Sequence, residues 1–293
     1  MNKIELQKFV LENPNLVSMK ETSKPNVFVL KYKKKVFYKG LWNEYLEECR
    51  GTIVDKDFNI ISRPFTKIYN YGIEDRSPVI GLKEMVDVYR KVNGFMVAVT
   101  LYEDDLLVST TGSIDSDFVK MALQMIDREK YLKVCRDYPD TTFLFECVHK
   151  SDPHIIPEVE GMYLIGFRSN SWDCYADIWP NMLLIAARKF GCFYPEHFRC
   201  ALEELLMKIK DCKHEGFVFY TDEGISAKIK SPYYLIKKFV SRNPNTDKLM
   251  NKDIKGKIDE EYYPLINKIQ ENIEMFTNMD EQSRLKWVSE FLG

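Results

Sequence analysis

A lysine between two apolar runs is the residue in this sequence whose setting most favours covalent chemistry. Lys91 opens a Lys-x-x-Gly tetrapeptide that ends at Gly94, and strand-like apolar residues precede and follow it. A free lysine has a pKa of about 10.4, so almost none of it is nucleophilic at neutral pH. Burial and neighbouring cations lower that pKa, which is how a lysine becomes a covalent catalyst. The tetrapeptide alone also fits an ordinary hairpin with a surface lysine.

Two carboxylates stand at the ends of apolar, strand-like runs. Glu146 follows Phe143-Leu144-Phe145, and Glu215 precedes Phe217-Val218-Phe219-Tyr220. A carboxylate beside a buried strand end is costly unless it forms an ion pair, bonds a ligand hydroxyl or holds a metal ion. Each of the two is therefore a candidate for a binding or metal-ligand role.

Four cations have spacings that suit phosphate binding. Lys228 and Lys230 alternate with Ile229, so a strand would place both lysines on one face, where they need a shared anion or water. Arg50 precedes a glycine at a strand start, and Lys67 follows a Pro-Phe segment. Arg50 and Lys67 fit either surface cations beside a hairpin or phosphate clamps, because arginine can donate two parallel bonds to one phosphate.

Periodicity predicts an alternation of strands and helices that would position these residues. The basic run from Lys31 to Lys35 is expected at the solvated edge of a hairpin, with phosphate binding left open. Helices are expected at 2–12, 115–137, 181–190, 201–210 and 233–241, and strands at 27–30, 36–38, 106–110, 143–147, 161–167, 215–220 and 225–230.

Length and composition indicate an ordinary globular protein. The chain has 293 residues, of which 45% are hydrophobic and 29% charged. The net charge of −2 creates no global attraction for nucleic acid, so any polyanion site must be a local cluster of Lys and Arg. Seven cysteines without paired close spacing predict reduced thiols and a cytoplasmic location. No signal peptide, membrane span, zinc-ligand spacing, Walker loop or dinucleotide fingerprint is recognised.

The order of Lys91, Glu146, Glu215 and the Lys228/Lys230 pair resembles that of the covalent nucleotidyltransferases, which include ATP-dependent ligases and mRNA capping enzymes. The chain resembles more closely the RNA ligase 1 family of T-even bacteriophages. The closer resemblance covers roughly residues 45 to 241 and lies in Glu48-Cys49-Arg50-Gly51, Ser62-Arg63-Pro64 with Lys67, Gly112-Ser113-Ile114, Glu215-Gly216-Phe217-Val218 and Lys228-Ile229-Lys230-Ser231.

This resemblance implies a role for each candidate residue. Lys91 would take AMP, Lys228 and Lys230 would grip the phosphates as catalytic cations, and Tyr234 falls on a family aromatic. The expected ATP-binding set is Arg50, Lys67, Lys91, Gly94, Glu146, Glu215, Lys228 and Lys230, and the expected ligands of Mg²⁺, or of Mn²⁺ in its place, are Glu146 and Glu215.

The fold implied is α+β: a nucleotidyltransferase (adenylyltransferase) domain of antiparallel sheets flanked by helices over residues 1–242, N-terminal extension included, and a small helical domain over 243–293. The implied activity is ATP-dependent joining of 3′-hydroxyl and 5′-phosphate RNA ends through enzyme-lysyl-AMP and RNA-adenylate, in RNA repair. A polynucleotide kinase-phosphatase would act upstream, no membrane would be involved, and the location would be the host cytoplasm if the protein is viral.

The chain also departs from the family pattern. Asn93 stands where the family has Asp, Phe95 replaces a small polar residue, Thr111 stands in place of a lysine, and the C-terminal segment is short. The natural RNA and the oligomeric state stay open. Two alternatives remain: another covalent nucleotidyltransferase, such as a DNA ligase or capping enzyme, and a non-catalytic nucleic-acid-binding relative.

Overall fold

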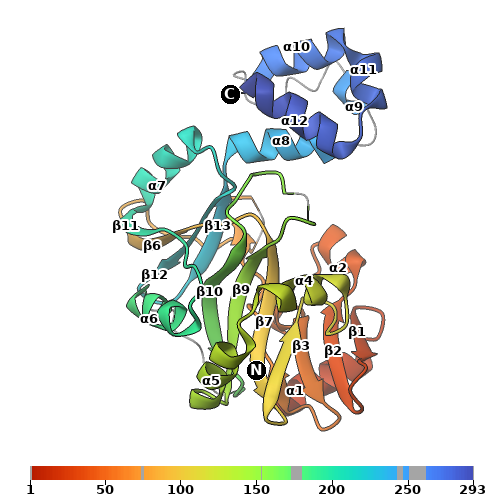
Figure 1. The fold of residues 1–293 in the computed structure, drawn as a ribbon, viewed down its shortest axis with the longest axis vertical. Helices are drawn as coiled ribbons and strands as arrows, with labels where there is room; N and C mark the ends of the chain where they lie inside the picture. The colour runs from red at the N-terminus through yellow and green to blue at the C-terminus, as the bar shows by residue number, and fades with distance from the viewer. Residues whose placement is uncertain are drawn as a thin grey trace. The chain divides into compact units, whose positions relative to one another are not determined.

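The computed structural model describes residues 2–73, 76–152, 154–172, 180–242, 247–250 and 262–292. The chain forms two compact units (Figure 1). Unit 1 comprises Met1–Tyr69, Gly94–Asp152 and Val159–His197, and unit 2 comprises Asn70–Asn93, Pro153–Glu158 and Phe198–Gly293.

Unit 1 contains two four-stranded antiparallel sheets, with strand orders β1-β2-β3-β4 and β10-β9-β7-β8. Its elements are α1 (Lys3–Glu12), β1 (Val17–Glu21), β2 (Val27–Tyr32), α2 (Lys34–Tyr38), α3 (Glu44–Glu48), β3 (Arg50–Asp55), β4 (Ile60–Ser62), β7 (Phe95–Tyr102), β8 (Asp105–Ser109), α4 (Asp117–Met125), α5 (Arg128–Asp137), β9 (Thr141–Val148), β10 (Gly161–Ser169) and α6 (Pro180–Phe190).

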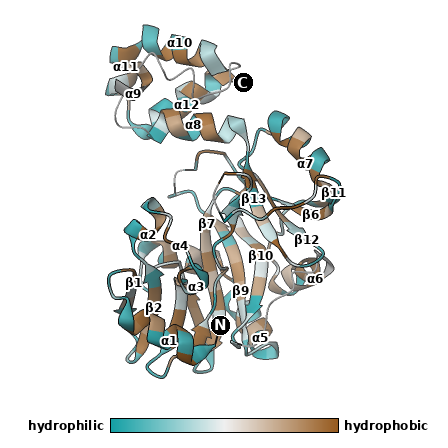
Figure 2. Ribbon diagram, turned by 180° about the vertical axis from the view of Figure 1, so that it is seen from behind, coloured by the Kyte–Doolittle hydropathy of each residue, from teal (hydrophilic) through white to brown (hydrophobic). Residues whose placement is uncertain are grey.

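The core of unit 1 lies between and around these sheets. Val29 and Ile53 of the first sheet pack with Leu107 of the second. Helix α1 places Leu6 against the other face of the first sheet, and aromatic contacts join Phe145 of β9 to Phe190 of α6. Burial of such apolar area contributes about 25 cal/mol per Å². The brown strands of Figure 2 show how the apolar residues gather in the sheets.

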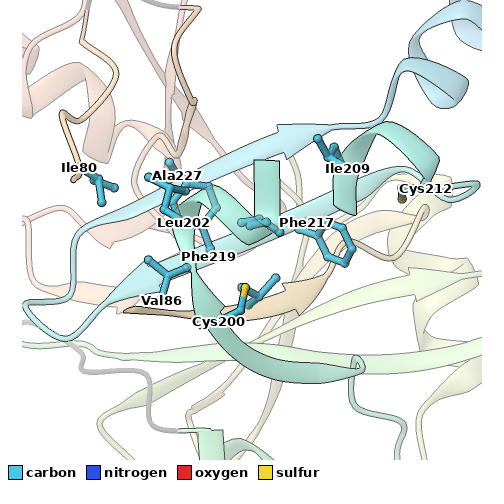
Figure 3. Packing of buried hydrophobic residues seen from close by; sticks show 11 residues of the cluster. Ile80, Val86, Cys200, Leu202, Ile209, Cys212, Phe217, Phe219 and Ala227 are labelled. Atoms are coloured by element: carbon cyan, nitrogen blue, oxygen red, sulfur yellow. The ribbon is translucent and has the colours of Figure 1, made fainter. Parts of the chain in front are cut away.

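Unit 2 is built on one sheet with the order β11-β6-β12-β13-β5. Val86, Phe219 and Ala227 of this sheet belong to one buried cluster with Leu202 of α7 (Figure 3). Its elements are β5 (Tyr69–Asn70), β6 (Met85–Arg90), β11 (His197–Ala201), α7 (Leu202–Lys208), the 3-10 helix η1 (Ile209–Asp211), β12 (Gly216–Thr221), β13 (Ser226–Lys230), α8 (Pro232–Arg242), α9 (Asp247–Met250), α10 (Tyr263–Glu271), α11 (Ile273–Asn278) and α12 (Glu281–Leu292).

The C-terminal helices share a core with α8. Ile236 and Val240 of α8 pack with Ile266, Phe276 and Val288 of the following helices. Residues 243–246, 251–261 and 293 of the expected C-terminal domain lie outside the described residues. The boundary at residue 242 stays a prediction.

The predicted α+β class is confirmed, with antiparallel sheets, flanking helices and short C-terminal helices. Two local predictions were wrong. Residues 36–38 belong to α2 rather than to a strand, because consecutive lysines favour helix over strand and a single turn suffices to bury Val36 alone. The expected helix at 115–137 is broken, since Ile126 is extended and Asp127 caps the new helix α5.

Strands β1 and β11 were not predicted. None of the described helices is long and apolar enough to cross a membrane.

Candidate active site

Lys91 lies immediately beyond the end of β6 in unit 2. Its backbone N–H donates to the carbonyl oxygen of Gly216 at 2.8 Å, and Arg90 pairs with Phe217 across β6 and β12. This antiparallel register brings the end of β6 to the start of β12, which Glu215 precedes. Gly216 has a φ of +133°, and a Cβ there would lie 2.1 Å from the Ile229 carbonyl oxygen, so glycine is required at this position.

Glu215 is the centre of a charged cluster. Lys91 Nζ lies 3.2 Å from its Oε2, and Lys230 Nζ lies 3.1 Å from its Oε1. The Glu215 side chain is only 3% exposed, whereas the two lysine side chains are 23% and 22% exposed. Pairing of Gly216 with Lys230 across β12 and β13 explains the second contact. One buried carboxylate thus holds two ammonium groups that still face solvent.

Asn93 fixes the orientation of that carboxylate. Its Nδ2 donates to Glu215 Oε2 at 2.7 Å, and its Oδ1 accepts the backbone N–H of Ile156 at 3.0 Å. An ionised aspartate offers no donor, and its charge would lie against that of Glu215. The departure from the family pattern at Asn93 therefore supplies a neutral donor to Glu215.

The protonation state of Glu215 follows from its neighbours. Burial alone would raise the pKa of this carboxyl, but the ammonium groups of Lys91 and Lys230, with hydrogen bonds from Lys230 and Asn93, outweigh burial and hold the pKa below its usual value. Glu215 is therefore a carboxylate with both oxygens engaged.

The strand β13 and the start of α8 complete the unit 2 cluster. Lys230 Nζ lies 4.8 Å from the centre of the Tyr234 ring, a distance typical of a cation–π contact. Burial raises the pKa of Tyr234 to about 12, so its hydroxyl keeps its proton. Lys228 lies two residues before Lys230 on the same face of β13, and its backbone carbonyl accepts from the N–H of Tyr71.

A second buried carboxylate joins this cluster, and the sequence did not reveal it. Glu158 Oε2 accepts from Arg90 Nη2 at 2.8 Å, and the Glu158 side chain is 4% exposed. Burial raises the pKa of Glu158 and outweighs the positive charge of Arg90, which lowers it. The negative charge of Glu215 raises this pKa further. Glu158 lies in a short loop without a periodic pattern. Pro157, its neighbour, is the one local signal in the sequence, and it indicates a loop but no role for Glu158.

The remaining predicted residues lie in unit 1. Arg50 donates from Nη1 to the carbonyl oxygen of Thr66 at 2.9 Å. Lys67 Nζ lies 4.9 Å from the Trp42 ring centre and 3.9 Å from that of Tyr69. Arg50 thus contacts the segment that follows β4, next to Lys67, and Lys67 contacts two aromatic faces.

Glu146 and Gly94 are neighbours within unit 1. Glu146 pairs with Met96 across β9 and β7, and its Oε1 accepts the backbone N–H of Gly94 at 3.1 Å. A Cβ at Gly94 would lie 2.3 Å from the Cys147 carbonyl oxygen, so the Lys-x-x-Gly glycine allows two backbones to approach closely. Glu146 is 9% exposed and thus largely buried.

Glu48 organises the segment that carries Arg50. Its buried carboxylate accepts from Arg63 Nε at 2.8 Å and from Arg168 Nη1 at 3.0 Å. Burial opposes ionisation, but the two guanidinium groups outweigh it and lower the pKa of Glu48. This network ties the end of α3, the Ser62-Arg63-Pro64 segment and β10 together, which gives the Glu48-Cys49-Arg50-Gly51 motif a positioning role.

The structure thus brings Lys91, Glu215 and Lys230 together in unit 2, with Lys228 on the same strand as Lys230. It places Arg50, Lys67, Gly94 and Glu146 in unit 1. Among the described residues, no three His, Cys, Asp or Glu side chains gather to hold a metal ion by themselves. A cluster with one ionised buried carboxylate and two lysines can bind phosphoryl oxygens and, through Glu215, one ligand position of a hydrated cation.

Comparison with known proteins decides among the enzyme classes that share such clusters. A family model described as RNA ligase matches residues 48–234, which is more than half of the chain. The chain belongs to the RNA ligase family. The resemblance seen in the motifs is confirmed, and so is the prediction that the protein is an RNA ligase enzyme.

Solved structures share the fold of this ligase at low sequence identity. Two structures of an archaeal ATP-dependent RNA ligase, forms 2 and 1, are 15% and 16% identical, with TM-scores of 0.59 and 0.58. They are matched over 96% and 81% of this chain and over 75% and 64% of theirs. A protein of Aquifex aeolicus described as an ATP-dependent DNA ligase is 18% identical, with a TM-score of 0.58 over 94% of this chain and 72% of its own.

Proposed function

We propose that this ligase uses ATP to join 3′-hydroxyl and 5′-phosphate RNA ends, with Lys91 as the residue that becomes adenylylated. The observation that carries the proposal is the contact of Lys91 with the buried Glu215, which also holds Lys230. A lysine beside a second cation and a fixed carboxylate at a strand end is equipped for phosphoryl chemistry. Family membership supplies the RNA substrate.

Three steps would follow. The neutral Nζ of Lys91 attacks the α-phosphorus of ATP, so that a P–N bond forms and the bond to pyrophosphate breaks. An oxygen of the RNA 5′-phosphate then attacks the same phosphorus, and the Lys91 nitrogen leaves and regains a proton. Finally the RNA 3′-hydroxyl attacks the activated 5′-phosphorus, loses its proton and releases AMP. Each step spreads charge over phosphoryl oxygens, so positioned cations stabilise it.

Within unit 2, Lys230 and Lys228 would bind phosphoryl oxygens, and the Asn93 amide would hold the Glu215 carboxylate in its observed orientation. Within unit 1, Arg50 and Lys67 would bind phosphate, and Glu146 would contact the nucleotide ribose or a metal-bound water. This assignment of Arg50, Lys67 and Glu146 to the same ATP rests on the order of the family motifs along the chain.

The residues fit a divalent cation of the Mg²⁺ type. Mg²⁺ usually keeps several waters and takes only one or two protein carboxylates, and the ionised Glu215 provides one such ligand. Glu146 is the proposed second ligand. When bound, the cation would neutralise charge on the transferring phosphoryl group. In its absence Glu215 stays paired with Lys91 and Lys230, so a cation at Glu215 competes with both ammonium groups.

A role in RNA repair, with a kinase-phosphatase preparing the ends, is part of the proposal and rests on the same resemblance. The test is ligation of a 5′-labelled RNA carrying a 3′-hydroxyl, with ATP and Mg²⁺, beside a DNA of the same sequence. We expect RNA to be joined and ATP to be required. Joining only of DNA, or transfer of GMP from GTP in place of AMP, would replace the proposal with a DNA ligase or a capping enzyme. Absence of any nucleotide transfer would indicate a non-catalytic binding protein.

A further inference from the structure

A basic and aromatic surface surrounds the short helix α2 in unit 1. We call it the α2 surface and define it by the exposed side chains of Lys31, Lys33, Lys34, Lys35, Phe37, Tyr38 and Lys39. Phe37 is 58% exposed and Tyr38 is 78% exposed, whereas Val36 between the lysines and the aromatics is fully buried and anchors the helix.

The charge of the α2 surface is of one sign. Its five lysines fall within nine residues, and the sequence has no Asp or Glu between Glu21 and Glu44. In the part of the chain that the structure describes, none of the five forms an ion pair, although many other lysines do. The whole protein carries a net charge of −2, so this concentration of positive charge is local. Such a cluster attracts a polyanion.

The aromatic side chains of α2 add a second recognition element. The Phe37 and Tyr38 rings lie edge to face with centroids 5.7 Å apart and planes 80° apart. Most of both rings is open to water, and among the described residues neither ring packs in the buried cluster that contains Val36. Proteins that bind single-stranded nucleic acid combine a positive track for the backbone with aromatic faces on which bases stack. The α2 surface contains both.

The α2 surface lies near two residues of the family motifs in unit 1, Lys67 and Gly112. Trp42, four residues after Tyr38, contacts Tyr32 at a ring-centroid distance of 4.7 Å and lies under Lys67. On the other side, Lys31 Nζ lies 2.7 Å from the position that a Cβ on Gly112 would occupy. Lys67 and Gly112 both belong to family motifs, so a strand bound along α2 would lie beside them within unit 1.

We propose that the α2 surface binds the single-stranded RNA substrate, with its lysines on the phosphates and Phe37 and Tyr38 stacking on bases. The identification of the polyanion as RNA rests on the function proposed above. A membrane-binding helix needs a longer apolar face than one helical turn provides. A protein partner would leave five unpaired lysines to be matched by acidic residues, whereas one RNA strand supplies an anion at every nucleotide.

The experiment measures binding of a fluorescein-labelled single-stranded oligouridylate to the full chain without ATP, across a salt series. One triple and one double variant separate the contributions: Lys33→Ala/Lys34→Ala/Lys35→Ala and Phe37→Ala/Tyr38→Ala. Matched controls are Lys56→Ala/Lys133→Ala and Tyr138→Ala, which change exposed residues elsewhere in unit 1.

The triple lysine variant should bind RNA about tenfold more weakly at low salt, with the slope of log K against log salt reduced by about 2 because each phosphate contact contributes roughly 0.7 on single strands. The aromatic variant should lose about fivefold or more with an unchanged slope, since stacking contributes ~1–3 kcal/mol per base. RNA affinities equal to those of the controls would overturn the proposal. Binding of the unaltered protein to anionic lipid vesicles, without binding of RNA, would overturn it too.

Self-adenylylation by labelled ATP, assayed without RNA, separates this inference from the proposed function. We expect both α2 variants to form the adduct at the rate of the unaltered protein. Loss of RNA binding in the variants, together with absence of the adduct in the unaltered protein, would sustain the RNA surface and refute the enzymatic proposal. Normal adduct formation in the unaltered protein, with unchanged RNA binding in the variants, would support the enzymatic proposal and refute the RNA surface.

Discussion

Lys91 and Glu215 form an ion pair in which the lysine Nζ lies 3.2 Å from the carboxylate Oε2. The same oxygen accepts the Asn93 amide at 2.7 Å, and the other oxygen lies 3.1 Å from Lys230 Nζ. The side chain proposed as nucleophile and a proposed phosphate-binding lysine therefore share one counterion. Changes at Glu215 should affect both lysines at once.

Replacement of Glu215 by glutamine should weaken both stability and adenylylation. Glu215→Gln keeps the shape but removes the charge that compensates Lys91 and Lys230. Breaking a buried ion pair costs ~3–5 kcal/mol, and the partly exposed lysines place the expected loss near the lower limit. Urea denaturation and the initial rate of adduct formation measure the two effects. The control Glu290→Gln alters an exposed pair and should change stability by less than about 1 kcal/mol. Unaltered stability and rate in Glu215→Gln would show that the cluster has no such role.

Asn93 should act by positioning Glu215 through its neutral amide. Asn93→Ala leaves the Ile156 N–H and one lone pair of Glu215 unsatisfied, which costs ~1–3 kcal/mol of stability. Asn93→Asp restores the acceptor for Ile156 but places a second carboxylate against Glu215. We therefore expect the adenylylation rate of Asn93→Asp to depend on pH more steeply than that of the unaltered protein, because one of the two carboxyls must take a proton. Superimposable pH profiles would contradict this account of Asn93.

Local patterns in the sequence predicted much of the sheet framework and the site residues on it. Glu215, Lys228 and Lys230 stand in a hairpin whose alternation is visible in the sequence, and antiparallel pairing with β6 is enough to bring Lys91 to them. Glu158 could not be predicted in the same way, because its contact with Arg90 depends on the path of an irregular loop. The turn of α2 was missed because Val36-Phe37-Tyr38 is too short for its period to distinguish helix from strand.

Glu48 should make the stability of the protein depend on acid. Its folded pKa is lowered from the usual value near 4.5, so the stability it contributes is present above that value and is lost as pH falls through the folded pKa. At pH 7, Glu48→Gln should lower the free energy of unfolding by ~3–5 kcal/mol because two buried arginines lose their counterion. The difference between variant and unaltered protein should shrink below about pH 4.5. The control Asp57→Asn alters an exposed turn residue and should change the free energy of unfolding by less than about 0.5 kcal/mol. A difference that stays constant with pH would assign the effect to packing instead of charge.

The four proposed phosphate cations should each contribute to adduct formation. Removing a cation that binds a buried phosphate costs ~2–4 kcal/mol of transition-state stabilisation. At about 1.4 kcal/mol per decade, each alanine variant should form the adduct roughly thirty-fold more slowly or worse. The variants are Arg50→Ala, Lys67→Ala, Lys228→Ala and Lys230→Ala. A near-normal rate in any of them would place that residue outside the nucleotide site.

The most direct test of the central claim is to locate AMP on the protein. The ligase is incubated with labelled ATP and Mg²⁺, and the modified peptide is identified by mass spectrometry, with Lys91→Ala carried in parallel. We predict AMP on Lys91, no adduct in Lys91→Ala, and sealing by that variant of RNA supplied with a pre-adenylylated 5′ end. An adduct mapped to Lys83, Lys228 or Lys230, or retained in Lys91→Ala, would contradict the assignment of Lys91 as the nucleophile.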